Sequence, residues 1–125
     1  MEAVDLNKKE LEMLLEKLKG YEKPKIYFEQ YETPTSIISY IVNKANLRNE
    51  IKDKIVFDLC CGTGRFAIAL SFFNPKKIFA IDIDKDAIKI AKENAKNFNV
   101  KNIYFIVANL LELKLKIKAD LAIIN

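Results

Sequence analysis

Two aspartates that flank a glycine-rich turn are the residues best suited to bind a small charged ligand. Asp58 ends an apolar run, Gly62 and Gly64 lie in the turn that follows, and Asp82 ends the next apolar run. A turn between a strand and a helix directs backbone N–H groups at a ligand above the sheet edge. The glycines let a ligand approach the backbone, and Asp82 has the spacing of an acid that binds ribose hydroxyls. The pattern therefore predicts a ligand that contains a ribose.

Asp58 distinguishes between two such ligands. Residues 62–67 match the glycine pattern of NAD-binding turns, but the Asp58 carboxylate would lie near the pyrophosphate of NAD and repel it. S-adenosylmethionine (SAM) has a ribose and carries an ammonium group in place of phosphates. We therefore predict SAM as the cofactor, with Asp82 on the ribose hydroxyls and the methionine tail close to the glycine turn.

Apolar runs alternate with helical patterns along the rest of the chain. We expect helices at about 8–19, from 34 onward, through 66–73 and at about 85–98, and strands at about 54–59, 78–81, 103–107 and 119–124. Residues 111–117 alternate in polarity and could form a short edge strand or an irregular return. Fully apolar strands are typical of a parallel sheet covered on both faces. The predicted fold class is α/β, a Rossmann-like doubly wound parallel sheet of about four core strands, preceded by N-terminal helices.

Short polar residues indicate where the helices begin and end. Residues 7–10 form a capping box, and Gly20 would end the first helix. Thr33-Pro34 predicts an N-cap followed by proline at the first helical position, and Asp84 is a good N-cap for the last helix. We expect an N-terminal helical extension over residues 1–25 and a cofactor-binding domain over residues 26–125.

The amino-acid composition disfavours several kinds of functional site. Histidine is absent, and the two cysteines, Cys60 and Cys61, are adjacent, which argues against a metal centre, a disulfide framework and the usual general base. A net charge of +4 is compatible with an anionic partner. No apolar run approaches the roughly 20 residues of a membrane span, and the acidic start is unlike a signal peptide. We expect a cytoplasmic protein without membrane contact, and the Lys-, Glu- and Ile-rich usage is typical of a thermophile.

Three motifs together resemble a known family. Residues 58–64 with Asp82-Ile83-Asp84 resemble motifs I and II of the class I SAM-dependent methyltransferases. Gln30-Tyr31-Glu32-Thr33-Pro34 is similar to the Q-Y-x-T-P element of adenine-N6 methyltransferases, and residues 119–125 look like the approach to their N-P-P-[FY] motif. The combination most resembles the rRNA adenine-N6 methyltransferases of the methyltransferase-like-protein-five type and their archaeal relatives.

The resemblance implies a set of cofactor-binding residues. In such a site, Gln30 and Thr33 contact the methionine carboxylate region, and Asn109 and Leu110 lie beside the adenine ring. Asn109 stands where an acid is usual, and its amide oxygen can still accept from the adenine amino group; Cys60 replaces the usual first glycine. The complete predicted set is Gln30, Tyr31, Thr33, Asp58, Cys60, Gly62, Thr63, Gly64, Arg65, Asp82, Ile83, Asn109 and Leu110.

The resemblance also implies the catalytic group. In the family, the motif's asparagine amide and first proline carbonyl accept the two N–H bonds of the adenine amino group, while the aromatic residue stacks on the flipped base. Of these groups only Asn125 is present. We therefore predict Asn125 as the catalytic residue, and we expect the 125 residues to bind SAM without methylating.

Substrate and partners follow from the same resemblance. RNA, specifically rRNA adenine, is the first substrate hypothesis; DNA adenine or a protein glutamine amide is the second, because the same asparagine motif serves all three. A non-catalytic SAM- or nucleotide-binding module is the alternative of another class. The strand at 119–124 would form an exposed apolar edge that favours self-association. The strand at 103–107 would form the opposite edge, which some relatives use to bind a small zinc-ribbon activator protein.

Overall fold

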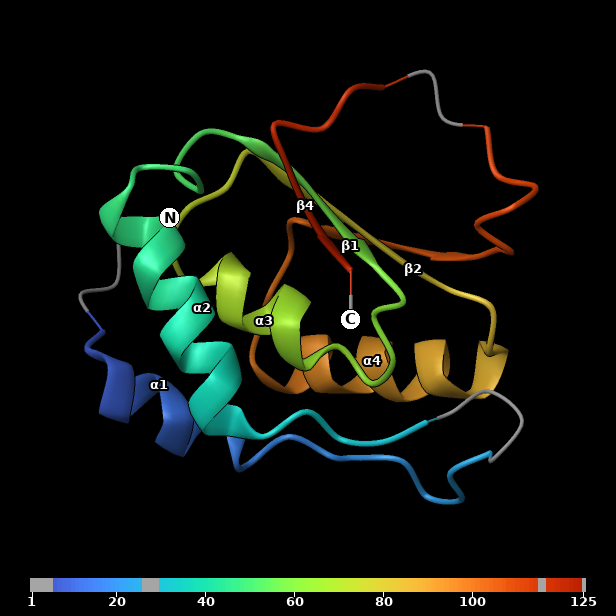
Figure 1. Cartoon of the computed structure of the whole chain (residues 1–125). Helices are drawn as coiled ribbons and strands as arrows, with labels where there is room; N and C mark the ends of the chain where they lie inside the picture. Colours follow the sequence, from blue (N-terminus) through green and yellow to red (C-terminus); the bar gives the residue numbers. More distant parts are fainter. Residues whose placement is uncertain (1–5, 26–29, 115–116, 125) are drawn as a thin grey trace.

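The computed structural model describes residues 6–25, 30–114 and 117–124 (Figure 1). Two helices precede the first strand, and two more connect the next strands. In chain order the elements are α1 (Lys8–Leu15), α2 (Thr35–Leu47), β1 (Ile55–Leu59), α3 (Arg65–Ser71), β2 (Lys77–Asp82), α4 (Lys85–Asn97), β3 (Ile103–Val107) and β4 (Leu121–Ile124). The predicted order of strands and helices is confirmed, with bounds that differ by a few residues.

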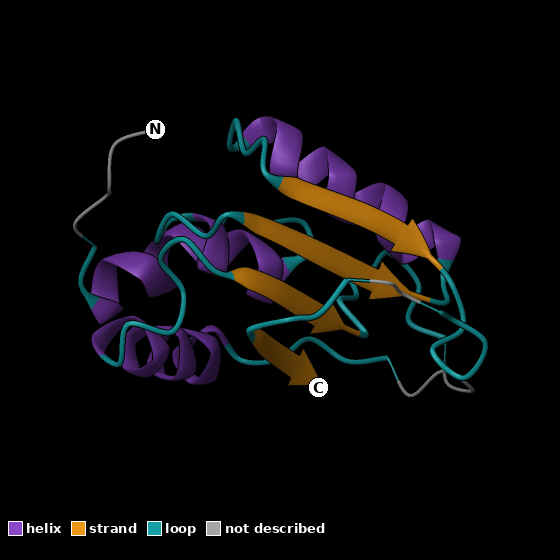
Figure 2. Ribbon diagram, turned by 90° about the horizontal axis from the view of Figure 1, so that it is seen from above, coloured by secondary structure: helices purple, strands orange, loops and turns teal. Residues whose placement is uncertain are grey.

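The four strands form one parallel sheet with the order β3-β2-β1-β4, and Figure 2 shows them pointing the same way. Asp58 of β1 pairs with Ala80 of β2 on one side and with Ile123 of β4 on the other. The Rossmann-like fold is therefore confirmed, and β3 and β4 lie at opposite edges as expected. The carboxyl ends of β1 and β2 lie side by side, which brings the two predicted ligand-binding aspartates together.

The described helices all lie on one face of the sheet (Figure 1). Val56 and Asp58 of β1 point to this face and are fully buried, whereas Phe57 points to the other face and is partly exposed. The expectation of a sheet covered on both faces is therefore wrong for the described residues. The reason is the β3–β4 connection, which makes turns and no helix where it is described, so the face of Phe57 has no helical cover.

The first two helices differ from their predicted bounds. α1 ends at Leu15 and not near Gly20, because the N–H groups of Lys17 and Leu18 bond to carbonyls three residues back and tighten the chain. α2 begins at Thr35, with Pro34 as its N-cap at ψ 136°. Thr33 is thus not the N-cap, because the extended Pro34 separates it from the helix.

Residues before and after the predicted boundary at residue 25 share one hydrophobic core. Leu11, Leu15 and Leu18 are buried in the same cluster as Ile38 of α2 and Val56 of β1. The division into a 1–25 extension and a 26–125 domain remains a prediction, and the core runs across it. Within the described ranges, every helix is too short or too polar to cross a lipid bilayer.

Asn94 of α4 joins this N-terminal part to the glycine turn. Its Nδ2 donates to the backbone carbonyls of Lys19 (2.8 Å) and Thr63 (2.9 Å), and its Oδ1 accepts from the N–H of Lys19 (2.9 Å). The side chain is almost completely buried. One amide therefore holds two irregular segments against α4.

Replacing Asn94 by alanine should lower the free energy of unfolding by about 3 kcal/mol, since each buried backbone group left without a partner costs about 1–3 kcal/mol. Urea denaturation monitored by circular dichroism measures this. Asn97→Ala is the matched control, because Asn97 lies in the same helix and is exposed. An equal loss in the two variants would contradict the role assigned to Asn94.

Candidate cofactor-binding site

The turn between β1 and α3 has an unusual backbone. Cys60, Gly62 and Gly64 all have positive φ angles, at 68°, 54° and 91°. A Cβ on Gly64 would meet the Cβ of Ala91 at 3.1 Å, so this glycine allows the turn to pack on α4. A Cβ on Gly62 would collide with the hydroxyl of Tyr21. Because Gly62 has no Cβ, the hydroxyl of Tyr21 can pack directly against the turn.

Asp58 lies beneath the turn with an unsatisfied carboxylate. The residue is 1% exposed, and its Oδ2 has no hydrogen-bond partner among the described residues. Its pKa is raised to about 7, mainly by burial and also by the negative charge of Asp82, against the opposing effect of a hydrogen bond from the Ala67 backbone. A cation placed above this carboxylate would supply the missing partner.

Asp82 braces the turn from the end of β2. Its Oδ2 accepts from the N–H of Gly62 (2.8 Å) and its Oδ1 from the N–H of Asp84 (2.9 Å). The carboxylate is partly exposed, and each oxygen can accept a second bond. Asp82 can therefore hold the turn and still bind the hydroxyls of a ligand.

The two thiols in the turn are chemically quiet. Burial raises the pKa of Cys60 and of Cys61, and the nearby carboxylates of Asp58 and Asp82 raise both further. Both thiols stay protonated at neutral pH, which disfavours the thiolate that a nucleophile or metal ligand requires. No group of three metal-binding side chains occurs among the residues that the structure describes.

Residues 30–33 fold across the turn. The Arg65 guanidinium donates to the carbonyl of Thr33 (3.2 Å), and its Nε lies 3.3 Å from Oε2 of Glu32. Gln30 turns the other way: its amide nitrogen donates to Oδ2 of Asp84 (2.6 Å). The segment therefore contacts both the start of α3 and the start of α4.

Two cavities adjoin the turn. The first, the sheet-edge cavity, has a volume of about 230 Å³; the second, the loop cavity, has about 40 Å³, room for a few water molecules. The sheet-edge cavity is lined by Tyr21, Gln30, Tyr31, Cys60, Ile81, Asp82, Ile83, Ala108, Asn109 and Leu110. The loop cavity is lined by Tyr21, Tyr31, Glu32, Thr33, Ile38, Asp58, Cys60, Cys61, Gly62, Thr63, Arg65 and Phe66.

The structure brings most of the predicted cofactor residues to these two cavities. Gly64 lines neither, because it packs against α4, and Asn125 lies outside the described residues. Gln30 lies with Asp82 and Asn109 in the sheet-edge cavity, apart from Thr33 in the loop cavity. The roles assigned to individual residues remain predictions.

Sequence reasoning missed Tyr21 and Glu32. Tyr21 lines both cavities, and no spacing pattern in the sequence distinguishes it. Glu32 is the variable position of the Q-Y-x-T-P element, yet its carboxylate accepts from the backbone of Tyr21 (2.6 Å) and pairs with Arg65. The contacts that define these two residues are tertiary and leave no local signal.

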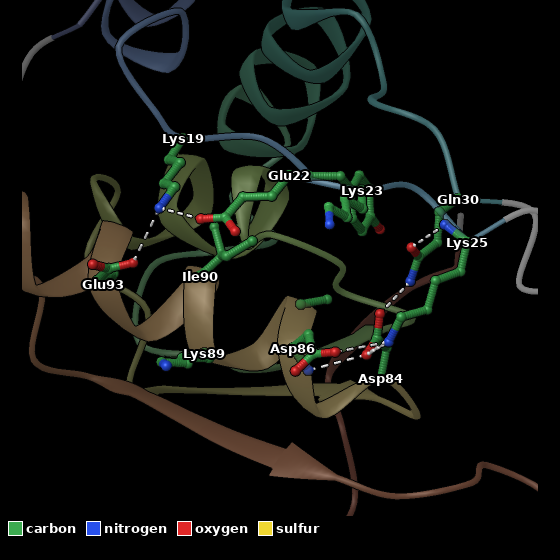
Figure 3. Close-up of a pocket in the computed structure, with 12 residues that line it drawn as sticks. Lys19, Glu22, Lys23, Lys25, Gln30, Asp84, Asp86, Lys89, Ile90 and Glu93 are labelled. Atoms are coloured by element: carbon green, nitrogen blue, oxygen red, sulfur yellow. Dashed lines mark hydrogen bonds and ion pairs between the residues drawn. The ribbon is translucent and has the colours of Figure 1, made fainter.

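A third cavity, the strap groove, lies between residues 19–25 and α4 and has a volume of about 380 Å³ (Figure 3). Ion pairs border it at both ends: Lys19 with Glu22 (2.6 Å), and Lys25 with Asp84 (2.7 Å) and Asp86 (2.9 Å). We call residues 19–25 the strap, because these contacts hold it across α4.

The residues present fit SAM better than a dinucleotide. The unpartnered oxygen of Asp58 suits an ammonium group, and the partly exposed carboxylate of Asp82 suits ribose hydroxyls. Among the described residues, Arg65 is the one basic side chain that lines the sheet-edge and loop cavities, and it is paired with Glu32. In the described part of the chain, a pyrophosphate would therefore meet carboxylates and no unpaired cation.

The raised pKa of Asp58 predicts a pH-dependent stability. Because the folded-state value of about 7 exceeds the unfolded value of about 4, the favourable effect of the neutral form is complete below pH 4 and lost as pH rises through 7. Relative to Asp58→Asn, the wild-type chain should lose about 4 kcal/mol of unfolding free energy over that range. Urea denaturation at several pH values tests this, with Asp53→Asn as the exposed control; a pH-independent difference for Asp58→Asn would contradict it.

This chain is similar to known methyltransferases. Residues 50–125 match a family model described as a methyltransferase domain. An uncharacterised protein of Methanocaldococcus jannaschii is 42% identical over 95 residues, which are 76% of this chain and 42% of that protein. The rRNA N(6)-adenosine-methyltransferase METTL5 of Danio rerio is 36% identical over 96 residues, which are 76% of this chain and 46% of that enzyme.

A solved structure is also similar. The crystal structure of PH1948 from Pyrococcus horikoshii, named as a candidate RNA methyltransferase, superposes with a TM-score of 0.87 at 31% identity. The match covers 94% of this chain and 58% of that one. This chain spans about half the length of the relatives that it matches. The family match, the parallel sheet and the acid-flanked glycine turn agree: the chain belongs to the methyltransferase-domain family, whose cofactor is SAM.

Proposed function

We propose that this chain binds SAM across the sheet-edge and loop cavities as the cofactor-binding part of an RNA adenine-N6 methyltransferase. The observation that carries the proposal is Asp58, a fully buried carboxylate with an unpartnered oxygen beneath a glycine turn. Bound SAM would supply an electrophilic methyl group. The chain's residues bind the two ends of the cofactor and orient it.

The two cavities divide the cofactor between them. In the sheet-edge cavity, Asp82 accepts from the ribose hydroxyls, and Asn109 accepts from the adenine amino group through its amide oxygen. Ile83 and Leu110 supply apolar contact for the adenine ring. In the loop cavity, Asp58 accepts from the ammonium group of the methionine tail. This division is supported by the residues that line each cavity.

The tail also needs the wall formed by residues 30–33 to shift slightly. The loop cavity has only about 40 Å³ in this conformation, and residues 30–33 form one of its walls. A hydrogen bond from Arg65 to the carbonyl of Thr33 and the ion pair of Arg65 with Glu32 hold that wall to α3. We expect this wall to shift outward when the tail enters, while Asp58 stays fixed in β1.

rRNA adenine is the substrate that we propose, supported by the substrate named for the Danio rerio relative. Asn125 would accept from the adenine amino group. An assay with labelled SAM tests the substrate: label in rRNA adenine would support the proposal, whereas labelled DNA or glutamine would favour the alternative substrates.

Both sheet edges are candidate contact surfaces. Ile124 on β4 is 72% exposed, which supports the proposal of self-association through this strand. Sedimentation velocity tests it, and a constant monomer over a wide concentration range would contradict it.

On β3, the half-exposed Tyr104 and Val107 support the proposal that a zinc-ribbon protein adds a strand there. Slower hydrogen exchange of the β3 amides on adding such a protein tests it, and unchanged exchange would contradict it. Cytoplasmic location and a thermophilic source remain predictions.

Isothermal calorimetry with SAM and NAD tests the cofactor. We expect SAM to bind and NAD not to bind, because Asp58 attracts an ammonium group and repels a pyrophosphate. Asp58→Asn should weaken SAM binding by about tenfold or more, the usual effect of losing a hydrogen bond to a charged group. Asp53→Asn is the matched control, since it removes an exposed carboxylate outside the cavities. NAD binding without SAM binding would contradict the proposed function.

A further inference from the structure

Tyr21 lies where the three cavities of this region meet. Its side chain lines the sheet-edge cavity, the loop cavity and the strap groove. Its hydroxyl occupies the space that Gly62 leaves open by having no Cβ. The phenol therefore stands between the two ends of the cleft, next to the turn that the cofactor tail would approach.

The hydroxyl of Tyr21 is an unused hydrogen-bond donor. Among the described residues, the structure shows no hydrogen bond from it, whereas the backbone N–H of Tyr21 donates to Glu32. Burial raises the pKa of the phenol, and the nearby carboxylates of Asp82, Glu32 and Asp84 raise it further. The hydroxyl therefore stays protonated at neutral pH and can donate to an oxygen in the cleft.

The position of Tyr21 is fixed from outside the cleft. Before it, the backbone of Lys19 is bonded on both sides to the buried amide of Asn94. After it, Lys25 bonds to Asp84, whose side chain is 3% exposed (Figure 3). The strap thus holds the phenol at the turn through its contacts with Asn94 and Asp84, so that no ligand is needed to position it.

Several of the described residues that line the loop cavity are poorly suited to bind an anionic group. Asp58 and Glu32 suit the ammonium group of an amino acid and would repel its carboxylate. Arg65 is engaged by Glu32 and by the carbonyl of Thr33. The Thr63 hydroxyl already lies 3.4 Å from Glu32 as a donor. A neutral donor from the strap side would therefore suit the carboxylate of a methionine tail, beside the contacts predicted for Gln30 and Thr33.

We propose that Tyr21 is a further cofactor-binding residue, whose hydroxyl donates a hydrogen bond to the carboxylate of the methionine tail. The inference rests on the proposed binding of SAM and assigns this contact to a residue of the strap. It makes Tyr21 a specificity determinant: the hydroxyl favours ligands that carry the amino-acid tail over ligands that carry only the adenosine end.

The test compares SAM with 5′-methylthioadenosine, which keeps the adenosine and the sulfur and lacks the amino-acid tail. In Tyr21→Phe the ring remains and only the donor is lost, so we expect SAM affinity to fall about tenfold or more and methylthioadenosine affinity to stay within about twofold. Calorimetric Kd values for both ligands measure this. Tyr40→Phe, an exposed position on α2, is the matched control and should change neither value.

Three results would overturn the inference. Unchanged SAM affinity in Tyr21→Phe would show that the hydroxyl makes no contact with the cofactor. An equal loss for SAM and methylthioadenosine would show that the variant acts through the shape of the cleft, and urea denaturation of the variant would show whether its fold has weakened. Failure of the wild-type chain to bind SAM would instead contradict the proposed function, and this inference would fall with it.

Discussion

The buried carboxylate of Asp58 is the constraint on which the rest of the site depends. The residue sits in the central strand of the sheet, pairs with both neighbouring strands and is closed over by the glycine turn. Burying an acid without a full set of partners is costly, and the raised pKa expresses that cost. A structure that served stability alone would place an apolar residue here, as it does at Val56 on the same face.

The surrounding contacts hold the turn at this carboxylate while leaving one of its oxygens without a hydrogen-bond partner among the described residues. Asp82 bonds to the N–H of Gly62, and Asn94 bonds to the carbonyl of Thr63, so both sides of the turn are held by side chains from other elements. Tyr21 of the strap also packs against the turn, with its hydroxyl next to Gly62. Unsatisfied polar atoms that persist in an otherwise well-bonded region are typical of functional sites.

The helices, the strands and the acidic residues at the strand ends can be predicted from the sequence, because each depends on residues close together in the chain. The β3 bounds match the predicted 103–107, and Asp84 caps α4 by accepting from the N–H of Asp86, as its type and position suggest. The strap could not be predicted in this way, because Lys19 and Asn94 meet across 75 residues of chain. The uncovered face of the sheet could not be predicted either, because strands 103–107 and 121–124 are apolar enough to suggest that helices cover both faces.

The most direct test of this account is the ionisation of Asp58 with and without cofactor. The chemical shift of the Asp58 side-chain carboxyl carbon, followed by nuclear magnetic resonance across a pH titration, reports its pKa. We predict a value near 7 in the free chain and a clear decrease when SAM binds, because the ammonium group would stabilise the carboxylate. A pKa that does not change when SAM binds would contradict the claim that Asp58 receives the ammonium group.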